Sequence, residues 1–373
     1  MRGADGELRG GAQPAPGRPP VLPRDDLREL AGYHSPQVEA TVRLNTNESP
    51  IPPPAGFLAA VMQELGAVAW HRYPDRQAWQ LRSAIAEFHD VEPEMVLAGN
   101  GSNEVIQLIL LAYGGSGRTV ATFEPSYQLH AHIARVSGAR TITIERQPDF
   151  SLDRAQIRHV VQELAPDVTF LTTPNNPTGM LEPRENIEQA ATGAQGIVVI
   201  DEAYVEFAES SALPLVAEDR PLAVVRTFSK TWSMASLRLG YVVAPNWLVA
   251  ELEKVVLPYH LDAFKQLAGR VALRYAKETG SRVEKIVSER ARLSLELERL
   301  GLEVFPSSAN FILFRTQDIR AVDLWQSLVN RDVLIRDCSS WPRLEGCLRV
   351  TVGTPEENDH FLAAIESVFM RLP

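Results

Sequence analysis

Short, continuously apolar runs alternate with amphipathic stretches between about residues 90 and 245. The runs that predict strands are residues 118–123, 139–144, 167–173, 196–201, 222–228 and 239–244. Runs without a polar alternation are typical of strands that are buried on both faces, and strands separated by helices favour a parallel arrangement. The pattern therefore predicts a large α/β domain with a mostly parallel central sheet.

The C-terminal third of the chain has a different pattern. A helical period of apolar positions and then a charged continuation predict a long helix over residues 262–299, with Gly280 as its candidate point of interruption. Three strands are predicted at residues 309–315, 333–337 and 347–353, and a closing helix starts with Pro355 in its first turn. These elements indicate a second, smaller α+β domain.

The predicted boundaries follow from these two patterns. Residues 50–260 form the large domain, and residues 25–49 join residues 261–373 in the small domain. Residues 1–24 are rich in glycine and proline and lack the apolar core of a secretory signal, so we interpret them as a mobile leader.

Composition narrows the classes of partner. The 37 basic and 47 acidic residues give a net charge of −10 without a long basic run, which argues against nucleic acid as a partner. The best apolar segment, residues 105–113, is far shorter than the roughly 20 residues needed to cross a bilayer, so no membrane span is predicted. The only cysteines, Cys338 and Cys347, have no metal-ligand spacing and favour a reducing compartment, the cytoplasm.

Polar clusters follow several of the predicted strands, where ligands of α/β sheets bind. Residues 99–103, GNGSN, directly precede an apolar helix and serve either as a helix cap or as a phosphate cradle. TTPNNPTG, at residues 172–179, is typical of a rigid turn. Asp201 ends an apolar strand three residues before Tyr204, and its carboxylate suits either a helix cap or a cationic ring nitrogen.

Lys230 is the residue that most needs an explanation, because it follows the apolar run 222–228 with Ser229 beside it. An ammonium group in such a place loses hydration unless it finds a partner or loses its proton. A neutral lysine is nucleophilic and forms a Schiff base with an aldehyde. Pyridoxal phosphate needs such a lysine, an acid near its ring nitrogen and a phosphate cradle, and this chain offers all three at strand ends.

The motifs also carry a family resemblance. In chain order, GNGSNE, FEPSY, PNNPTG, DEAY, SK with Arg238 eight residues after Lys230, and LRVTVG resemble the fold-type I aminotransferases. RLNTNESP, HRYPD, PSSANFILF and VLIRD resemble, more narrowly, the histidinol-phosphate aminotransferase family. The resemblance runs from about Asp25 to the C-terminus. It implies a pyridoxal phosphate enzyme that converts histidinol phosphate and 2-oxoglutarate to imidazole acetol phosphate and glutamate, a step of histidine biosynthesis.

The resemblance assigns the reacting groups. Lys230 holds the cofactor and moves the proton between substrate and cofactor, which makes it the general base as well. Asp201 keeps the cofactor's ring nitrogen protonated. Tyr204 and Asn176 contact the ring's phenolic oxygen. Tyr127 stacks on the ring, and the alternative for it is an ordinary core aromatic residue.

The same resemblance assigns the outer contacts. The residues expected at the cofactor phosphate are Ser102, Asn103, Ser229 and Arg238. Guanidinium matches phosphate well, and the alternative for Arg238 is a surface ion pair. Tyr73 resembles a tyrosine that reaches the neighbouring subunit's phosphate, which implies a homodimer with shared sites.

The substrate contacts are expected to be mainly cationic, because both the phosphate of the donor and the carboxylates of 2-oxoglutarate are anions. Arg336 and Arg349 occupy the family's anion-binding positions, and Tyr33 resembles a tyrosine that helps them. Asn47 and Glu48 lie in the matching segment near the site. The alternative for Arg336 is a strand-end salt bridge, for example with Asp337.

The chain departs from the family pattern at two places. Asn103 stands where an acid is expected, and Ser236 stands where a glycine is usual. Trp232, two residues after Lys230, is a candidate for reshaping the pocket wall. Three other functions therefore remain open: an aromatic amino acid aminotransferase, a decarboxylase of the threonine phosphate type, and a non-catalytic regulatory module that binds the cofactor.

Overall fold

The computed structural model describes residues 21–22, 24–28, 30, 32 and 38–370. The chain divides into two compact units, residues 1–34 and 35–373. The described part of the first holds one short 3-10 helix, Asp25–Leu27. Most of the predicted leader and Tyr33 lie outside the described residues. The second unit holds both sheets, and its division into a large and a small domain stays a prediction.

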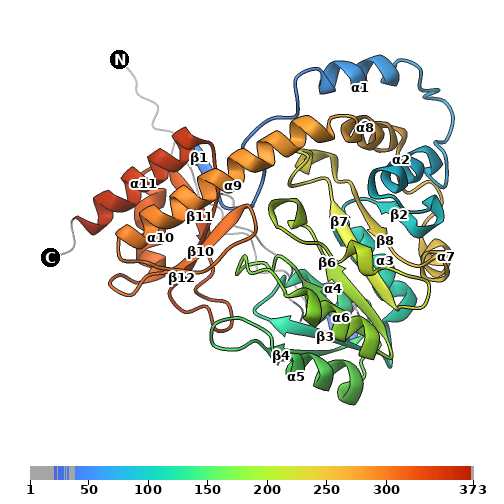
Figure 1. The fold of residues 1–373 in the computed structure, drawn as a ribbon, viewed down its shortest axis with the longest axis horizontal. Coiled ribbons are helices and arrows are strands. Elements are labelled where there is room, and N and C mark those ends of the chain that lie inside the picture. Colours follow the sequence, from blue (N-terminus) through green and yellow to red (C-terminus); the bar gives the residue numbers. More distant parts are fainter. Residues whose placement is uncertain (1–20, 23, 29, 31, 33–37, 371–373) are drawn as a thin grey trace, which may run out of the picture. The chain divides into compact units, whose positions relative to one another are not determined.

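Seven strands form the central sheet, in the order β2-β8-β7-β6-β5-β3-β4 (Figure 1). The strands are β2 (Val96–Gly99), β3 (Thr119–Glu124), β4 (Arg140–Glu145), β5 (Val168–Thr172), β6 (Ile197–Asp201), β7 (Leu222–Thr227) and β8 (Gly240–Val243). Only β8 runs antiparallel to its neighbours. The prediction of a mostly parallel sheet is confirmed, and β2 is the strand that it missed.

Helices cover both faces of this sheet. They are α1 (Phe57–Leu65), α2 (Trp79–His89), α3 (Ser102–Tyr113), α4 (Leu129–Val136), α5 (Arg154–Arg158), α6 (Arg184–Gly193), α7 (Asn246–Val255) and α8 (Ala263–Leu273). Successive residues of a strand enter different cores: Val225 of β7 packs with α3 and α7, whereas Val224 packs with α5 and α6. Since both faces are covered by helices, the strands carry the continuous apolar runs seen in the sequence.

A second sheet of five strands has the order β1-β11-β12-β10-β9. Its strands are β1 (Val42–Leu44), β9 (Glu303–Val304), β10 (Phe311–Arg315), β11 (Val333–Asp337) and β12 (Cys347–Thr351), with helices α9 (Ala276–Arg299), α10 (Ala321–Val329) and α11 (Pro355–Phe369). Thr354 caps α11, where its hydroxyl accepts from the amide of Glu357 and the Glu357 carboxylate accepts in return. The three predicted C-terminal strands and the closing helix are confirmed.

The long helix predicted over residues 262–299 is two helices, and the predicted interruption at Gly280 is wrong. The break lies at Arg274 and Tyr275, between α8 and α9. Buried residues of α8 pack with α2, whereas those of α9, such as Leu293, pack in the core of the five-stranded sheet. Figure 1 shows α9 leading from α8 to that sheet. The α-helix α9 continues through Gly280, and a Cβ there would meet no atom within 4 Å.

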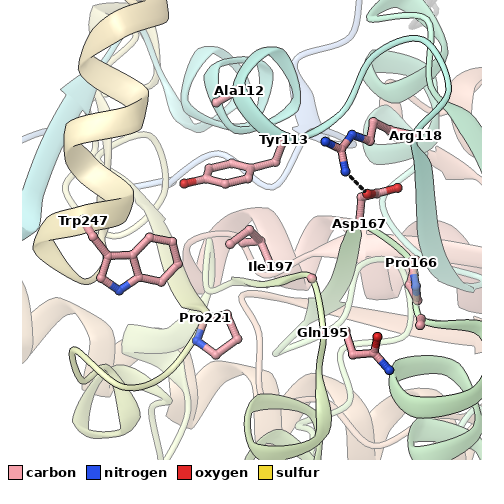
Figure 2. Close-up of a pocket in the computed structure, with 11 residues that line it drawn as sticks. Ala112, Tyr113, Arg118, Pro166, Asp167, Gln195, Ile197, Pro221 and Trp247 are labelled. Carbon is pink, nitrogen blue, oxygen red and sulfur yellow. Dashed lines mark hydrogen bonds and ion pairs between the residues drawn. The ribbon is translucent and has the colours of Figure 1, made fainter.

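A cavity of about 440 Å³ lies at the amino-terminal ends of β5 and β6 (Figure 2). Tyr113 and Trp247 line one side, and an ion pair of Arg118 and Asp167, with 2.5 Å between Nη1 and Oδ1, lines the other. This cavity is at the opposite ends of the strands from the polar clusters that the sequence singles out. Among the described residues, no helix combines the length and the apolar character that a bilayer crossing requires.

Candidate active site

The polar clusters meet at one edge of the central sheet. The carboxyl ends of β2, β3, β5, β6 and β7 share this edge because these strands are parallel to one another. Asp201 is the last residue of β6, and Lys230 follows β7 after a short turn. β1 and β12 of the five-stranded sheet bring Asn47 and Arg349 to the same place, as their hydrogen bonds show below.

Lys230 is a partly buried amine with an altered proton affinity. Its Nζ donates to the carbonyl of Thr46 at 2.8 Å and lies 5.8 Å from the centre of the Tyr204 ring. Burial lowers the pKa of Lys230 to about 7, the charge of Arg349 lowers it as well, and Glu48 opposes the shift. At slightly alkaline pH the amine is therefore mostly neutral, which is the nucleophilic form.

Asp201 is buried, with 2% of its surface exposed, and its carboxyl oxygens are held from two sides. Oδ1 accepts from the amide of Ala203 at 3.1 Å, and Oδ2 is 2.9 Å from Nε2 of His130. Because a carboxylate only accepts, Nε2 is the ring nitrogen that carries the proton. The His130 ring stacks on Phe170 with 4.4 Å between centroids, so its orientation is fixed as well.

Tyr204 lies at the centre of an amide cluster. Its hydroxyl accepts from Nδ2 of Asn47 at 3.0 Å and from Nδ2 of Asn176 at 3.4 Å. The Oδ1 of Asn176 in turn accepts from the guanidinium of Arg349, which also donates to the carbonyl of Asn45 at 3.1 Å. The structure therefore brings together four of the residues predicted from the sequence, from both sheets.

The predicted phosphate residues surround the first turn of α3. Arg238 Nη1 donates to Ser229 Oγ at 3.1 Å, and Nη2 would lie 2.8 Å from a Cβ at Gly101, the residue before the helix. Gly101 has φ +83°, so a side chain there is strained as well as crowded. A Cβ at Gly240 would come within 2.3 Å of the Ser102 amide, so a glycine is required for β8 to approach the helix end.

Helix ends of this kind bind anions, because their amides are unpaired and the helix dipole is positive there. Tyr127 donates from its hydroxyl to Oδ1 of Asn103 at 3.2 Å, which places both residues beside the turn. Arg238 donates to the Ser229 hydroxyl and, at 3.3 Å, to the carbonyl of Ala235, so its hydrogen bonds favour the phosphate position over a surface ion pair.

The two predicted substrate arginines face each other across β11 and β12. Arg336 and Arg349 are direct partners in the antiparallel register, so their side chains lie on the same face. The guanidinium of Arg336 lies 5.4 Å from the ring centre of Trp341, in a cation–π contact. The carboxylate of Asp337 accepts from the amide of Ser339 at 2.8 Å.

Three further residues that the sequence singled out make no hydrogen bond to this cluster among the contacts described above. Tyr73 is 80% exposed and stacks on Tyr259 with 4.5 Å between centroids. Glu48 is exposed, and it acts on Lys230 through its charge. Trp232 does not line the pocket wall: it is 5% exposed and packs with Phe228 and Phe88 in the core below α2. That expectation is wrong, because the turn directs this ring into the core.

Sequence reasoning missed His130 and Trp341. His130 is 71 residues from Asp201 in the chain, and its only sequence signal is a histidine three residues after Tyr127. Trp341 lies in the loop between β11 and β12, five residues after Arg336. Each of them fixes the orientation of a residue that the sequence did indicate.

The residues present fit pyridoxal phosphate. They supply an amine of lowered pKa, a buried carboxyl held by a histidine, and an anion cradle that a side chain at Gly101 would fill. Lys230 is the residue that would hold the cofactor, Asp201 would face its ring nitrogen, and Arg238 would meet its phosphate. In the described part of the chain, no group of three or more His, Cys, Asp or Glu side chains is arranged for a metal ion.

Comparisons with known proteins agree with this geometry. The model of the family "Aminotransferase class I and II" matches residues 39–365. A histidinol-phosphate aminotransferase of Streptomyces avermitilis is 44% identical over 359 residues, which cover 92% of this chain and 96% of that protein. A histidinol-phosphate aminotransferase of Corynebacterium efficiens is 41% identical over 356 residues, which cover 92% of this chain and 94% of that protein.

A solved structure shows the same fold. The histidinol-phosphate aminotransferase of Sinorhizobium meliloti, in complex with pyridoxal-5'-phosphate, superposes with a TM-score of 0.82 at 24% identity, covering 90% of this chain and 92% of that one. At this identity the likeness concerns the fold alone. The prediction of the type I pyridoxal phosphate transferase fold is confirmed.

Proposed function

The chain belongs to the class I and II aminotransferases, and from this premise we propose that it transfers the amino group of histidinol phosphate to 2-oxoglutarate. The products are imidazole acetol phosphate and glutamate, and the reaction belongs to histidine biosynthesis. The observation that carries the choice of substrate is the pair Arg336 and Arg349. They lie opposite each other in the sheet register, and the charge of Arg349 reaches Lys230.

Pyridoxal phosphate, when bound, supplies an aldehyde and an electron-accepting ring. Lys230 provides the amine that holds it, and this amine later takes and returns the proton of the substrate carbon. Asp201, held by His130, provides the hydrogen bond to the ring nitrogen. Tyr204 and Asn176, which already contact each other, provide polar groups for the ring's phenolic oxygen.

The phosphate of the cofactor is assigned to the first turn of α3. Ser102 and Asn103 begin this helix, and Arg238 with Ser229 closes the other side. Tyr127 is assigned to the face of the cofactor ring, since its hydroxyl donates to Asn103 and its ring makes a T-shaped contact with His130, with 5.3 Å between the ring centroids. Together these residues would hold the cofactor with its ring nitrogen toward Asp201.

The substrate's anionic group is assigned to Arg336 and Arg349. Arg349 is 6% exposed and is anchored by Asn176 and the carbonyl of Asn45, so its guanidinium is held in place before the substrate binds. Asn47 is assigned to the same side of the site, since its side-chain amide donates a hydrogen bond to the Tyr204 hydroxyl. Tyr33 is assigned to the same anion through the family resemblance only.

We further propose a homodimer with shared sites. Five large apolar side chains are between 58% and 80% exposed along α1 and the segments that flank α2 and α8: Leu58, Met62, Trp70, Tyr73 and Leu257. The stacking of Tyr73 on Tyr259 links two of these segments, and Arg270 binds Glu64 of α1 at 2.6 Å. A patch of this kind is typical of an interface, and its occupant would be the same patch of a second copy.

The location is proposed to be the cytoplasm. Cys338 and Cys347 are both buried and both free thiols, which fits a reducing compartment.

An amino-donor panel with 2-oxoglutarate tests the substrate assignment. Histidinol phosphate is expected to be the best donor, with ping-pong kinetics. Higher activity with phenylalanine or tyrosine would instead make the protein an aromatic aminotransferase. Release of CO2 from a phosphorylated amino acid without a keto acid would make it a decarboxylase. Stable cofactor binding without turnover of any donor would favour the third alternative, a non-catalytic regulatory module.

Two variants test the residue roles. Lys230→Ala is expected to lose both the visible absorbance of the bound cofactor and turnover while it keeps the fold. Arg336→Ala is expected to weaken the phosphorylated donor by roughly 1.5–3 kcal/mol, the scale of a charge-assisted hydrogen bond. Arg315→Ala, on β10 of the same sheet and paired with Glu303, is the matched control and should leave the donor's affinity unchanged. Equal effects of both arginine variants would refute the assignment.

Complementation tests the shared site. Tyr73→Ala and Lys230→Ala should each be nearly inactive alone, because each lacks one residue of every site. Mixed subunits in equal amounts should recover about a quarter of wild-type activity, since half of the dimers then hold one complete site. No recovery from a mixture that is shown to exchange subunits would place Tyr73 outside the shared site.

A further inference from the structure

A buried group of charged side chains lies behind the cofactor site. Glu202, which directly follows Asp201, is fully buried, and its Oε2 accepts from Nε and Nη2 of Arg226 at 3.0 and 2.8 Å. Arg226 is on β7, four residues before Lys230, and also donates to Ser211 at 2.8 Å. The other carboxylate oxygen of Glu202 accepts from the amide of Ala212, so both oxygens have partners.

Glu206, which is partly buried, lies beside this pair and has a different partner. Its Oε2 accepts from Oγ1 of Thr231 at 3.0 Å. Burial raises the pKa of Glu206, and the charge of Arg226 partly offsets this shift. A carboxyl in such surroundings lowers the stability of the protein, which suggests that it has a functional role. Its contact with the residue next to Lys230 indicates what that role is.

We propose that Glu206 and Thr231 are a positioning pair that sets the distance between Lys230 and Tyr204. This inference rests on the proposed function, in which these two residues hold the cofactor. Tyr204 directly precedes the 3-10 helix Val205–Phe207 that carries Glu206, and Thr231 directly follows Lys230. One hydrogen bond therefore joins the turn that carries the hydroxyl to the turn that carries the amine. The two turns come from neighbouring strands, β6 and β7.

The pair acts through geometry rather than through charge. The charges that shift the pKa of Lys230 are those of Arg349, Glu48 and Arg238, and Glu206 is not one of them. The Thr231 side chain is 5% exposed, so water does not replace its hydrogen bond without rearrangement. Loss of the bond releases the Lys230 turn while leaving the charges around the amine unchanged.

Thr231→Val and Thr231→Ser form a matched pair of variants, because valine keeps the shape of threonine and serine keeps the hydroxyl. The first measurement is the pH midpoint of the visible absorbance change of the protein loaded with pyridoxal phosphate. The second is kcat and KM for the amino donor. Valine is expected to shift the midpoint by about half a pH unit or more and to lower kcat about ten-fold, with a KM change of less than about two-fold. Serine is expected to match the wild type.

Glu206 variants give an independent arm. Glu206→Gln keeps an acceptor for Thr231 and is expected to match the wild type, whereas Glu206→Leu should resemble Thr231→Val. The double variant Thr231→Val with Glu206→Leu should be no worse than either single variant, because both remove the same bond. Thr231→Ala replaces the valine variant if that protein does not fold, as judged by its thermal unfolding.

A folded Thr231→Val protein with the wild-type midpoint and kcat would overturn the proposal. Equal defects in the serine and valine variants would overturn it too, because the hydroxyl would then have no part in the effect. The proposed function fails in a different way: the wild type would take up no cofactor or would turn over no donor. If the protein uses another amino donor than the one proposed, the wild type still has a measurable pH midpoint. The absorbance measurement then still tests the roles of Glu206 and Thr231.

Discussion

Replacing Lys230 with methionine in the cofactor-free protein is expected to change stability in a pH-dependent way. Burial lowers the pKa of Lys230 from an ordinary value of 10.5 to about 7. In the unfolded chain the amine takes up its proton below pH 10.5, but in the folded protein it does so only below about pH 7. Between these values the unfolded state binds one more proton, so the free energy of unfolding rises with pH across this window.

The size of the effect follows from the two pKa values. Burial of the protonated lysine lowers the free energy of unfolding. This loss has its full size below about pH 7, becomes smaller as the pH rises to 10.5, and is absent above that pH. The full difference is on the order of 5 kcal/mol. Methionine also loses the hydrogen bond to the Thr46 carbonyl, which contributes about 1 kcal/mol at every pH. Lys230→Met is therefore expected to be about 4 kcal/mol more stable than the wild type at pH 6 and slightly less stable at pH 10.5.

Denaturant unfolding of both cofactor-free proteins at a series of pH values measures this difference. The exposed Lys277, on α9, is the matched control, and Lys277→Met should show a small difference that does not depend on pH. A stability gain of Lys230→Met that stays constant from pH 6 to pH 10 would refute the reasoning. It would mean that the amine keeps an ordinary pKa in the folded protein and is not prepared to act as a nucleophile.

Three further predictions concern the residues around the amine. Gly101→Ala should weaken cofactor binding at least ten-fold in an absorbance titration, because its φ of +83° and its contact with the guanidinium both oppose a Cβ, whereas Gly280→Ala should bind the cofactor normally and stabilise α9 by about 0.5–1 kcal/mol. His130→Phe keeps the aromatic stack but loses the bond to Asp201, so kcat should fall about ten- to one-hundred-fold, and an unchanged kcat would contradict a positioning role. Trp341→Leu should raise the donor's KM about three-fold or more by removing the cation–π contact, whereas Trp341→Phe should retain most of the affinity.

Much of the fold could be predicted because its strands obey a single rule. Strands covered by helices on both faces read as nearly continuous apolar runs, and β5, β6 and β7 are buried at every position, with polar residues mainly at or near their ends. β2 was missed because its four residues, VLAG, end in a glycine and make a run too short to stand out. The break between α8 and α9 was missed because both helices continue the same period, although they bury their apolar residues in different cores.

Only the site residues that belong to recognisable sequence motifs could be predicted. Residue type and spacing identify Lys230, Asp201 and Arg238 in the sequence, because charged side chains are unusual at the end of a buried strand. His130 and Glu206 do not, since a histidine or glutamate on a helix has many ordinary explanations. Their importance arises from partners that the fold brings to them, at distances of 2.9 and 3.0 Å. Contacts between residues remote in sequence carry no local pattern to detect.

The position of Arg349 links substrate binding to the proton affinity of Lys230. Its charge is one cause of the lowered pKa of the amine, and the same guanidinium is the proposed partner of the substrate's anionic group. An anion bound there offsets the positive charge, so the amine binds a proton more readily when the substrate is present than when it is absent. A general base that removes a proton from the substrate carbon benefits from such a rise. On this proposal the five-stranded sheet does more than bind the substrate, because the charge of Arg349 also lowers the pKa of Lys230, a residue that the central sheet holds.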